Sequence, residues 1–273
     1  MILRRTFRAM NTDVELLLDP LPGIDSEAVL VAAEAEFHRL EALLSRFRPD
    51  SELSRLNEAG ELATGPELRE VVALAVAARE RTGGRFDPTV HDALVAAGYD
   101  RSFEHVEAAG PARPAGAACG GAVEIEGTTI RLGPGVRLDL GGIGKGYAVD
   151  RACDVLAPAG ACLVSAGGDL ACRGGSWPVG VTDELTVELT RGALATSGRD
   201  RRRWRSGGEE RHHLIDPATG VPAEGALLRA TVWADTAAEA EVLAKAAFLG
   251  AEVDVPRVLV TSDGRTVLEG GLA

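Results

Sequence analysis

The sequence predicts an α+β fold in which mainly antiparallel strands pack against helices. Segments with helical periodicity are concentrated before residue 110, whereas most of the short strand-like segments come after it and are bounded by turn residues. Because the two kinds of element are grouped rather than strictly alternating, the pattern favours α+β over a parallel βαβ arrangement. We expect one domain over residues 1–273, with a possible internal linker near residues 110–121, which are rich in Gly, Pro and Ala.

The chain is expected to open with two strands, over residues 3–9 and 14–18, joined by a turn at residues 10–12. A long helix should begin at an N-cap on Ser26, because apolar residues recur after it at helical spacing, namely Val29, Ala33, Phe37, Leu40 and Leu44. Pro66 and Gly83 frame a second helix over residues 67–81, since proline favours a helix start and glycine a helix end. A short third helix should follow Pro88.

Beyond residue 121 the expected elements are mostly strands. They cover residues 122–126, 129–132, 136–140, 162–166, 179–181, 186–189, 194–196 and 228–234, with a final hairpin over 258–261 and 266–269. A helix over residues 146–156 should follow the strand at 136–140. Thr236 and Glu239 form a capping box, which predicts another helix over residues 236–249.

The charge and cysteine content limit the classes of partner and compartment. Acidic residues outnumber basic ones 41 to 29, giving a net charge of −12, so we expect no nucleic-acid partner. The one basic run, residues 199–205, is interpreted as a solvated hairpin. No apolar stretch has the length of a membrane span or a signal peptide, and the four cysteines lack C-x-x-C spacing. We therefore expect a cytoplasmic protein with reduced thiols and no transmembrane segment.

The stretch Asp-Leu-Gly-Gly-Ile-Gly-Lys-Gly-Tyr-Ala-Val-Asp at residues 139–150 is the most informative in the chain. It brings a carboxylate, four glycines and Lys145 to the start of an expected helix, where free backbone N–H groups favour phosphate. Its spacing matches neither the P-loop nor the dinucleotide-binding fingerprint. Alone, the glycines are more typical of a tight turn that packs a helix on a strand. The motifs found elsewhere in the chain favour a site for a phosphorylated small molecule.

Several further motifs accompany this stretch in a fixed order. They include Thr-Gly-Gly-Arg-Phe-Asp-Pro-Thr-Val at residues 82–90 and His-His-Leu-Ile-Asp-Pro-Ala-Thr-Gly at residues 212–220. Together with residues 10–12, 45–47, 50–57, 166–169 and 196–198, they resemble the FAD:protein FMN transferase (ApbE) family across nearly the whole chain. The resemblance implies an ApbE-like fold and an enzyme that cleaves FAD, releases AMP and joins FMN to a Thr or Ser hydroxyl of an acceptor flavoprotein.

The resemblance also implies which residues form the site. Positions lining the FAD site would be Met10, Phe47, Arg85, Phe86, Asp87, Asp139, Lys145, Gly167, Gly168 and Ile215. Lys145 would supply positive charge for catalysis, and either His213 or Asp216 would act as the general base. Several of them have an ordinary alternative. Met10 and Phe86 also suit a core, the carboxylates of Asp87 and Asp216 also suit turns, and His213 is equally typical of a structural histidine.

The family's metal site is altered in this chain. The family pattern Ala-Asp-x-x-x-Thr binds Mg²⁺ on a late helix, but the matching residues here run from Ala240 to Lys245. The metal positions would be Gly142, Glu241, Ala244 and Lys245, and a lysine ammonium has no lone pair for a metal. One hypothesis places the Lys245 ammonium where the ion would be, paired with Glu241, which makes a Mg²⁺ requirement doubtful. The alternative is an ordinary i,i+4 surface pair.

Two other functions remain open from the sequence. The altered metal positions are compatible with an FAD-binding protein that lacks transferase activity, or with an FAD pyrophosphatase that gives FMN and AMP. Family members are often exported lipoproteins, and the expected absence of such a leader favours a soluble acceptor or one at the cytoplasmic face of a membrane complex.

Overall fold

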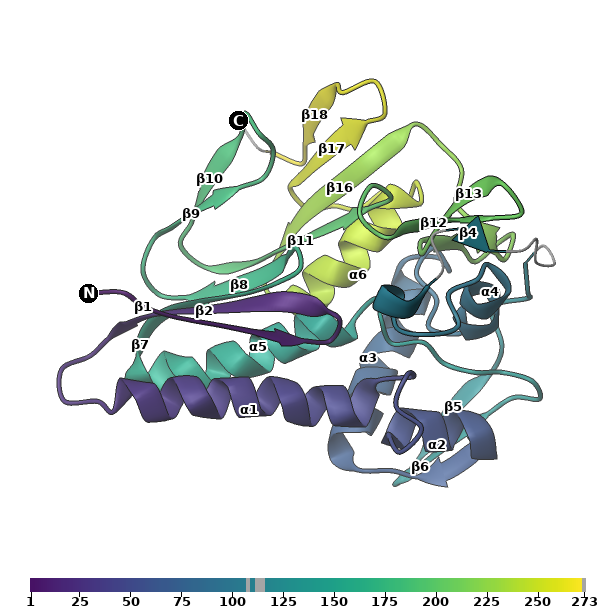
Figure 1. Cartoon of the computed structure of the whole chain (residues 1–273), viewed down its shortest axis with the longest axis horizontal. Helices are drawn as coiled ribbons and strands as arrows, with labels where there is room; N and C mark the ends of the chain where they lie inside the picture. Colours follow the sequence, from purple (N-terminus) through teal and green to yellow (C-terminus); the bar gives the residue numbers. More distant parts are fainter. Residues whose placement is uncertain (107–108, 111–115, 272–273) are drawn as a thin grey trace.

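An antiparallel sheet of eight strands forms the centre of the computed structural model, which describes residues 1–106, 109–110 and 116–271 (Figure 1). Its strand order is β1-β2-β7-β8-β11-β16-β17-β18, with every neighbouring pair antiparallel. The strands are β1 Leu3–Ala9, β2 Thr12–Pro20, β7 Gly160–Ala166, β8 Asp169–Arg173, β11 Gly192–Gly198, β16 Leu227–Ala234, β17 Arg257–Thr261 and β18 Thr266–Glu269. The predicted antiparallel α+β class is confirmed.

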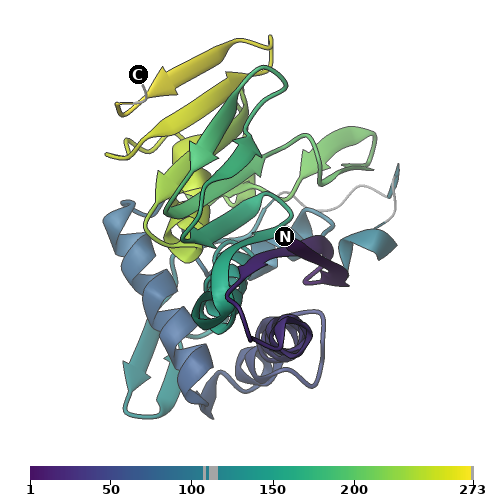
Figure 2. The ribbon, with the colours of Figure 1, turned by 90° about the vertical axis from the view of Figure 1, so that its left-hand side faces the viewer.

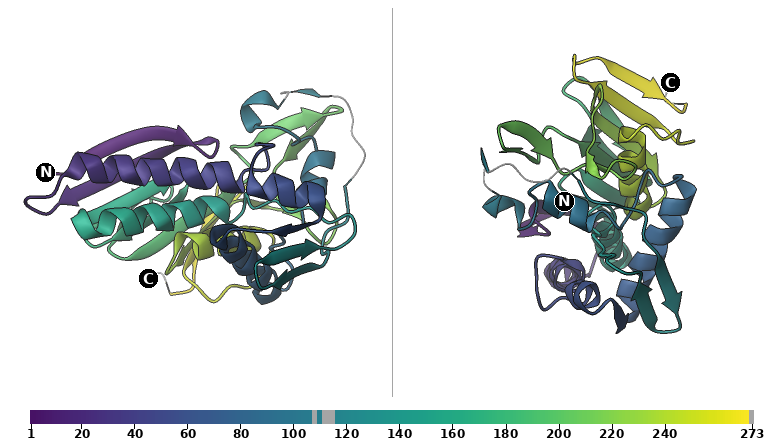
Figure 3. Two further views of the ribbon diagram at one scale, coloured as in Figure 1. Left: turned by 90° about the horizontal axis from the view of Figure 1, so that it is seen from below. Right: turned by 90° about the vertical axis from the view of Figure 1, so that its right-hand side faces the viewer.

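The described residues form six α-helices, namely α1 Ser26–Leu44, α2 Glu52–Ala59, α3 Pro66–Arg81, α4 His91–Ala96, α5 Gly144–Leu156 and α6 Ala237–Phe248. Helices α5 and α6 pack directly on one face of the main sheet. Helix α5 contacts β7 and β8, α6 contacts β11 and β16, and α1 lies beside α5 (Figure 3). The sheet lies above α1 in the side view of Figure 2. No helix among the described residues combines the length and apolar character that a membrane span needs.

Small sheets surround the main sheet. They are β9–β10 (Trp177–Gly180, Thr186–Leu189), β3–β6–β5 (Glu61–Ala63, Thr129–Leu132, Val123–Glu126), β13–β12–β4 (Glu209–His212, Arg203–Ser206, Ala109–Gly110) and β14–β15 (Ile215–Asp216, Val221–Pro222). The β9–β10 ribbon packs on the sheet face opposite the helices, where Leu163, Trp177 and Leu194 form a separate apolar cluster. The main core lies on the helical face and includes Val164, because neighbouring residues of a strand point to opposite faces.

Local signals set several elements as the sequence predicts. Thr236 caps α6 by accepting a hydrogen bond from the Glu239 N–H at 3.2 Å, and Pro66 stands at the first position of α3. Helix α1 differs in detail. Its N-cap is Asp25 rather than Ser26, and Leu30 rather than Val29 is buried on its inner face. The predicted final hairpin is confirmed as β17–β18.

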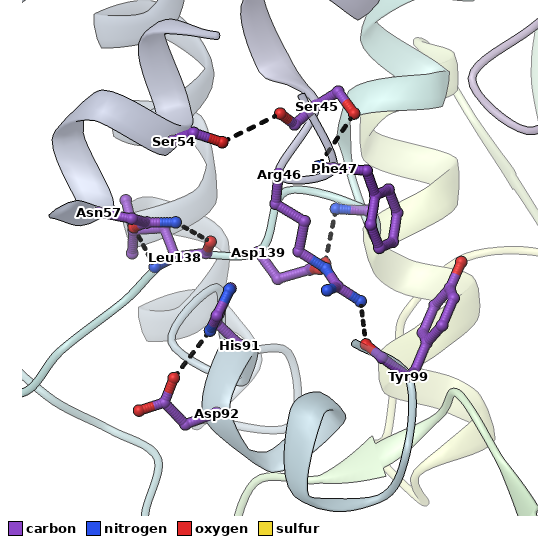
Figure 4. Close-up of polar contacts among 11 residues, drawn as sticks. Ser45, Arg46, Phe47, Ser54, Asn57, His91, Asp92, Tyr99, Leu138 and Asp139 are labelled. Atoms are coloured by element: carbon purple, nitrogen blue, oxygen red, sulfur yellow. Dashed lines mark hydrogen bonds and ion pairs between the residues drawn. The ribbon is translucent and has the colours of Figure 1, made fainter. Parts of the chain in front are cut away.

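Residues 136–140 do not form the predicted strand. The Asn57 side chain instead accepts from the Leu138 N–H at 2.7 Å and donates to the Leu138 carbonyl at 2.9 Å (Figure 4). The Asp139 N–H donates to the Pro88 carbonyl at 2.8 Å. Its hydrogen-bond partners are a side chain and a loop rather than a neighbouring strand, so its apolar pattern alone does not make it a strand. The helix that follows begins at Gly144 rather than at residue 146.

A second apolar cluster lies around α4. It contains Leu94, Tyr99, Trp204 and Ile215, and β12–β13 is the hairpin predicted for the basic run. Trp204 is not solvated as expected, because it is buried and its indole N–H donates to the Ala97 carbonyl at 2.9 Å. The helix α2 and the strands β3, β4, β8, β14 and β15 were not predicted. Within the predicted linker, residues 111–115 lie outside the described residues, and 116–121 have no regular secondary structure.

Candidate active site

Two adjoining cavities of about 220 and 250 Å³ lie at the N-terminal end of α5, where the main core meets the second apolar cluster around α4. Six residues line both cavities and therefore mark their junction: Asn11, Gly141, Lys145, Arg202, His213 and Lys245. Of the predicted FAD-site residues, Met10, Phe47, Arg85, Asp87, Asp139, Lys145 and Ile215 line the first cavity. Gly167 and Gly168 line the second. Segments far apart in the chain thus meet around one elongated space.

Asp139 and Arg46 form a buried ion pair in the first cavity (Figure 4). The Arg46 guanidinium also donates to the Tyr99 carbonyl at 2.7 Å and lies 4.1 and 4.8 Å from the ring centroids of Phe47 and Tyr99. Burial would raise the pKa of Asp139, but the charges of Arg46 and Lys245 and the Gly141 N–H lower it. Asp139 is therefore a fixed carboxylate, and the stacked guanidinium holds two aromatic rings at the cavity wall.

The sequence did not predict that Arg46 helps to form the cavity wall, although Arg46 lies within the family motif at residues 45–47. Its role depends on Asp139, which is distant in the sequence, so the only available signal was its position beside Phe47. Arg202 was also missed. It lines both cavities, and its guanidinium donates a 3.5 Å hydrogen bond to the Asn11 carbonyl.

Lys145 pairs with two buried carboxylates across the helix α5–α6 contact. Its ammonium lies 2.7 Å from Asp169 Oδ2 and contacts Glu241 Oε1, while Glu241 Oε2 accepts from the Gly146 N–H at 2.9 Å. Burial alone would lower the pKa of Lys145, but Asp169 and Glu241 raise it. Burial raises the pKa of Asp169 to about 6 against the opposing charge of Lys145. The positive charge of Lys145 is therefore balanced by these two carboxylates.

The predicted pair between Glu241 and Lys245 is not formed. Glu241 reaches back to α5, and among the described residues Lys245 makes neither an ion pair nor a hydrogen bond. The Lys245 ammonium lies 5.9 Å from the centroid of the Phe86 ring and against the Cα of Gly142, where a Cβ would collide with it. Burial lowers the pKa of Lys245, while the nearby carboxylates of Glu241 and Asp139 oppose that shift.

His213 and Asp216, the two general-base candidates, are placed differently. His213 lines both cavities, and its Nδ1 is buried without a partner in the described part of the chain, which leaves Nε2 for the cavity. Burial lowers the pKa of His213 well below its ordinary value, and Arg202 and Lys245 lower it further. Asp216 lines neither cavity. Its carboxylate accepts from the Ala218 N–H at 3.0 Å and so stabilises the turn after β14.

Three other predicted residues lie behind the cavity wall. Phe86 is buried beneath Lys245, and Gly142 and Ala244 are buried without lining either cavity. Asp87 does line the first cavity, but its Oδ1 accepts from the backbone and hydroxyl of Thr89 at 2.8 and 2.7 Å. Phe86 therefore supports Lys245 from behind and is not part of the cavity surface.

The predicted metal positions do not suit a divalent cation in this arrangement. Within the described residues, no group of three or more His, Cys, Asp and Glu side chains is placed to hold a metal ion. Glu241 and Asp169 are bound to the Lys145 ammonium, and the Lys245 ammonium offers hydrogen-bond donors but no lone pair. The donor set at Gly142, Glu241, Ala244 and Lys245 thus favours an anion over Mg²⁺.

The fold and the cationic junction define an α+β protein with a site for an extended anionic ligand. The sequence matches the ApbE family over residues 10–267. The chain therefore belongs to the ApbE family.

Curated relatives carry the name FAD:protein FMN transferase. The Rhodobacter capsulatus protein is 31% identical over 96% of this chain and 54% of its own length. The Salmonella typhimurium protein is 30% identical over 73% of this chain and 64% of its own length. The chain thus spans between about half and two thirds of these relatives.

Solved structures share the fold over almost the whole chain. The ApbE protein of Thermotoga maritima superimposes with a TM-score of 0.88 at 25% identity, covering 98% of this chain and 97% of that one. The flavin transferase ApbE from Vibrio cholerae gives a TM-score of 0.80 at 24% identity with the same coverage. The ApbE-like fold predicted from the motifs is confirmed.

Proposed function

We propose that this protein transfers FMN from FAD to a Thr or Ser hydroxyl of an acceptor flavoprotein and releases AMP. The observation that carries this proposal is the junction of the two cavities, where His213 and the cations Lys245 and Arg202 lie together. The names of the relatives support the same reaction. Neutralising a diphosphate and deprotonating a hydroxyl at one point is what phosphoryl transfer to an alcohol requires.

The first cavity suits one of the two ring systems of FAD. Phe47 lines it beside the Arg46 guanidinium, whose pairing with Asp139 fixes the wall. A planar ring gains from stacking on such aromatic and guanidinium surfaces. The diphosphate would then lie at the junction, near the first turn of α5, where the positive charges of Lys245 and Arg202 favour negative charge.

The acceptor would approach from the second cavity, with its hydroxyl near His213. The hydroxyl oxygen attacks the flavin-side phosphorus and forms a new P–O bond. The bond from that phosphorus to the bridging oxygen breaks, and AMP leaves with the bridging oxygen. His213 Nε2 takes the hydroxyl proton and passes it to solvent. Mg²⁺ enters no step, because the donor set at its predicted positions does not fit it.

We also propose that the protein acts in a reducing compartment such as the cytoplasm. Its four cysteines are free thiols, and three of them are buried. A single functional unit over residues 1–273, without a nucleic-acid partner, completes the proposal.

The test is incubation with FAD in the presence and absence of an acceptor flavoprotein, followed by denaturation. AMP release together with flavin covalently attached to the acceptor supports the transferase. AMP and free FMN without attachment would show a pyrophosphatase, and saturable FAD uptake without AMP would show a binding protein.

A further inference from the structure

Lysine is almost absent from this chain except at the site. Of its 29 lysines and arginines, only two are lysines, Lys145 and Lys245, and both line the two cavities. Lysine differs from arginine in carrying a compact ammonium that fits where a guanidinium does not. The rare residue is therefore used where a small point charge has to fit between close backbone segments.

The two ammonium groups have opposite environments. Lys145 lies between Asp169 and Glu241, both 3% exposed, so its charge is more than balanced within the protein. Lys245, four residues after Glu241 on α6, has no carboxylate within ion-pair distance in the described part of the chain. Glu241 does not bind it because both of its carboxylate oxygens are taken by α5.

The other acidic side chains of the junction are also occupied. Asp139 is paired with Arg46, and Asp200 at the rim of the second cavity is paired with Arg229. Lys245, Arg85 and Arg202 line the cavities without a carboxylate partner among the described residues. This surplus of positive charge is local, because the whole chain carries a net charge of −12.

The Gly141–Gly142 turn is shaped around Lys245. A Cβ on Gly142 would overlap the Lys245 ammonium and lie 3.1 Å from the Phe86 ring, so a side chain there would push the ammonium away. Phe86 closes the space behind it at 5.9 Å. Lys245 is thus held at the junction by close packing alone, and a partly buried ammonium of this kind calls for an anionic partner.

We infer that Lys245 binds the diphosphate of FAD directly and takes the place of a divalent cation, while Lys145 keeps Asp169 and Glu241 from acting as metal ligands. This inference rests on the proposed function. It assigns the two lysines separate tasks, one holding the carboxylates and the other meeting the substrate. FAD binding and cleavage should then proceed without Mg²⁺.

The test compares FAD with riboflavin, which lacks the diphosphate. Both are titrated by fluorescence quenching in EDTA and again with excess Mg²⁺, using the wild type, Lys245→Met, Lys245→Arg and Arg265→Met. The last variant loses the same charge from an exposed position of the final hairpin. Unfolding midpoints show that each variant is folded.

We expect wild-type FAD affinity to be the same in EDTA and in Mg²⁺. Lys245→Met should weaken FAD binding by roughly tenfold to a hundredfold, the size of a lost charge-assisted hydrogen bond, and leave riboflavin unchanged. Lys245→Arg should keep part of the FAD affinity, and Arg265→Met all of it. With ¹⁵Nζ-labelled lysine, the signal missing from Lys245→Met should shift on FAD addition in the wild type.

Three outcomes would count against the inference. FAD affinity that is lost in EDTA and restored by Mg²⁺ overturns it, as does a Lys245→Met variant that binds FAD like Arg265→Met. An equal loss for riboflavin also overturns it, since the diphosphate is then not what Lys245 recognises. FAD binding without flavin transfer would instead defeat the proposed function and leave the role of Lys245 standing.

Discussion

The Lys145 ammonium of helix α5 is bound to the Glu241 carboxylate of helix α6, and the second Glu241 oxygen accepts from the Gly146 N–H at 2.9 Å. This contact joins two helices that pack on neighbouring strands of the main sheet. It also leaves Lys245 without its i−4 partner. The internal arrangement of charges at the site therefore depends on this one interhelical pair.

Replacing Lys145 with Met should destabilise the fold strongly. Asp169 and Glu241 would remain buried without their cation, and breaking a buried pair in this way costs about 3–5 kcal/mol. Urea unfolding followed by circular dichroism measures the loss. The double variant Lys145→Met, Glu241→Gln should recover part of it. A single variant as stable as the wild type would contradict the pairing.

The Arg46–Asp139 pair should tolerate even a conservative change poorly. Arg46→Lys keeps the charge but loses the donation to the Tyr99 carbonyl and the stacking on Phe47, so we expect a loss of about 1–3 kcal/mol and weaker FAD binding. The matched control is Arg131→Lys, which lies outside both cavities and whose exposed pair with Glu61 spans 3.0 Å and contributes little. Equal effects of the two variants would argue against a buried structural role for Arg46.

The pH dependence of transfer should report a histidine with a lowered pKa. The neutral His213 ring accepts the proton, and it predominates at every pH above the pKa, which burial places well below the ordinary 6.5. kcat/KM for FAD should therefore stay level from pH 7 to 6.5 and fall only in more acid solution. If kcat/KM instead falls to half its plateau at or above pH 6.5, a His213 with a lowered pKa is not the general base.

Replacing His213 and replacing Asp216 should have different effects on the transfer rate and on stability. His213→Ala should lower the transfer rate by roughly 10²- to 10⁴-fold, the usual contribution of a general base, with FAD binding largely kept. Asp216→Ala should lower the unfolding midpoint and affect the rate far less, because it removes the oxygen that accepts from the Ala218 N–H and stabilises the turn. Rates and FAD affinities measured together decide this, and the reverse order would move the base to Asp216.

Gly146 should not accept a side chain. A Cβ there would overlap the Ala237 carbonyl at the start of α6, so Gly146→Ala should cost about 1–3 kcal/mol despite the better helix propensity of alanine. Gly180→Ala is the control, because nothing lies within 4 Å of its Cβ position. Thermal unfolding of both variants measures the difference. A Gly146→Ala variant that is more stable than the wild type would show that the helices approach less closely.

The sequence predicts elements whose signals are local. The Thr236 cap of α6 and the Pro66 start of α3 depend on a few adjacent residues, and both are found in the structure. Residues 136–140 were wrongly predicted as a strand, because extended apolar backbone looks the same whether a strand or the Asn57 side chain takes its hydrogen bonds. That choice is made by tertiary structure.

The same limit applies to the site. Met10, Asp139, Lys145 and His213, which the motifs grouped together, line one cavity, but spacing along α6 suggested a Glu241–Lys245 pair. The structure replaces that pair with one across two helices, which no periodicity within α6 reveals. Partners that are distant in the sequence decide which charges are balanced and which face the ligand.

The most direct test of the central claim uses FAD labelled with ³²P at either of its two phosphates. After incubation with an acceptor flavoprotein and denaturation, the flavin-side label should remain on an acceptor Thr or Ser, and the adenosine-side label should appear in AMP in equal amount. Recovery of both labels in small molecules only would contradict the transfer of FMN by this protein.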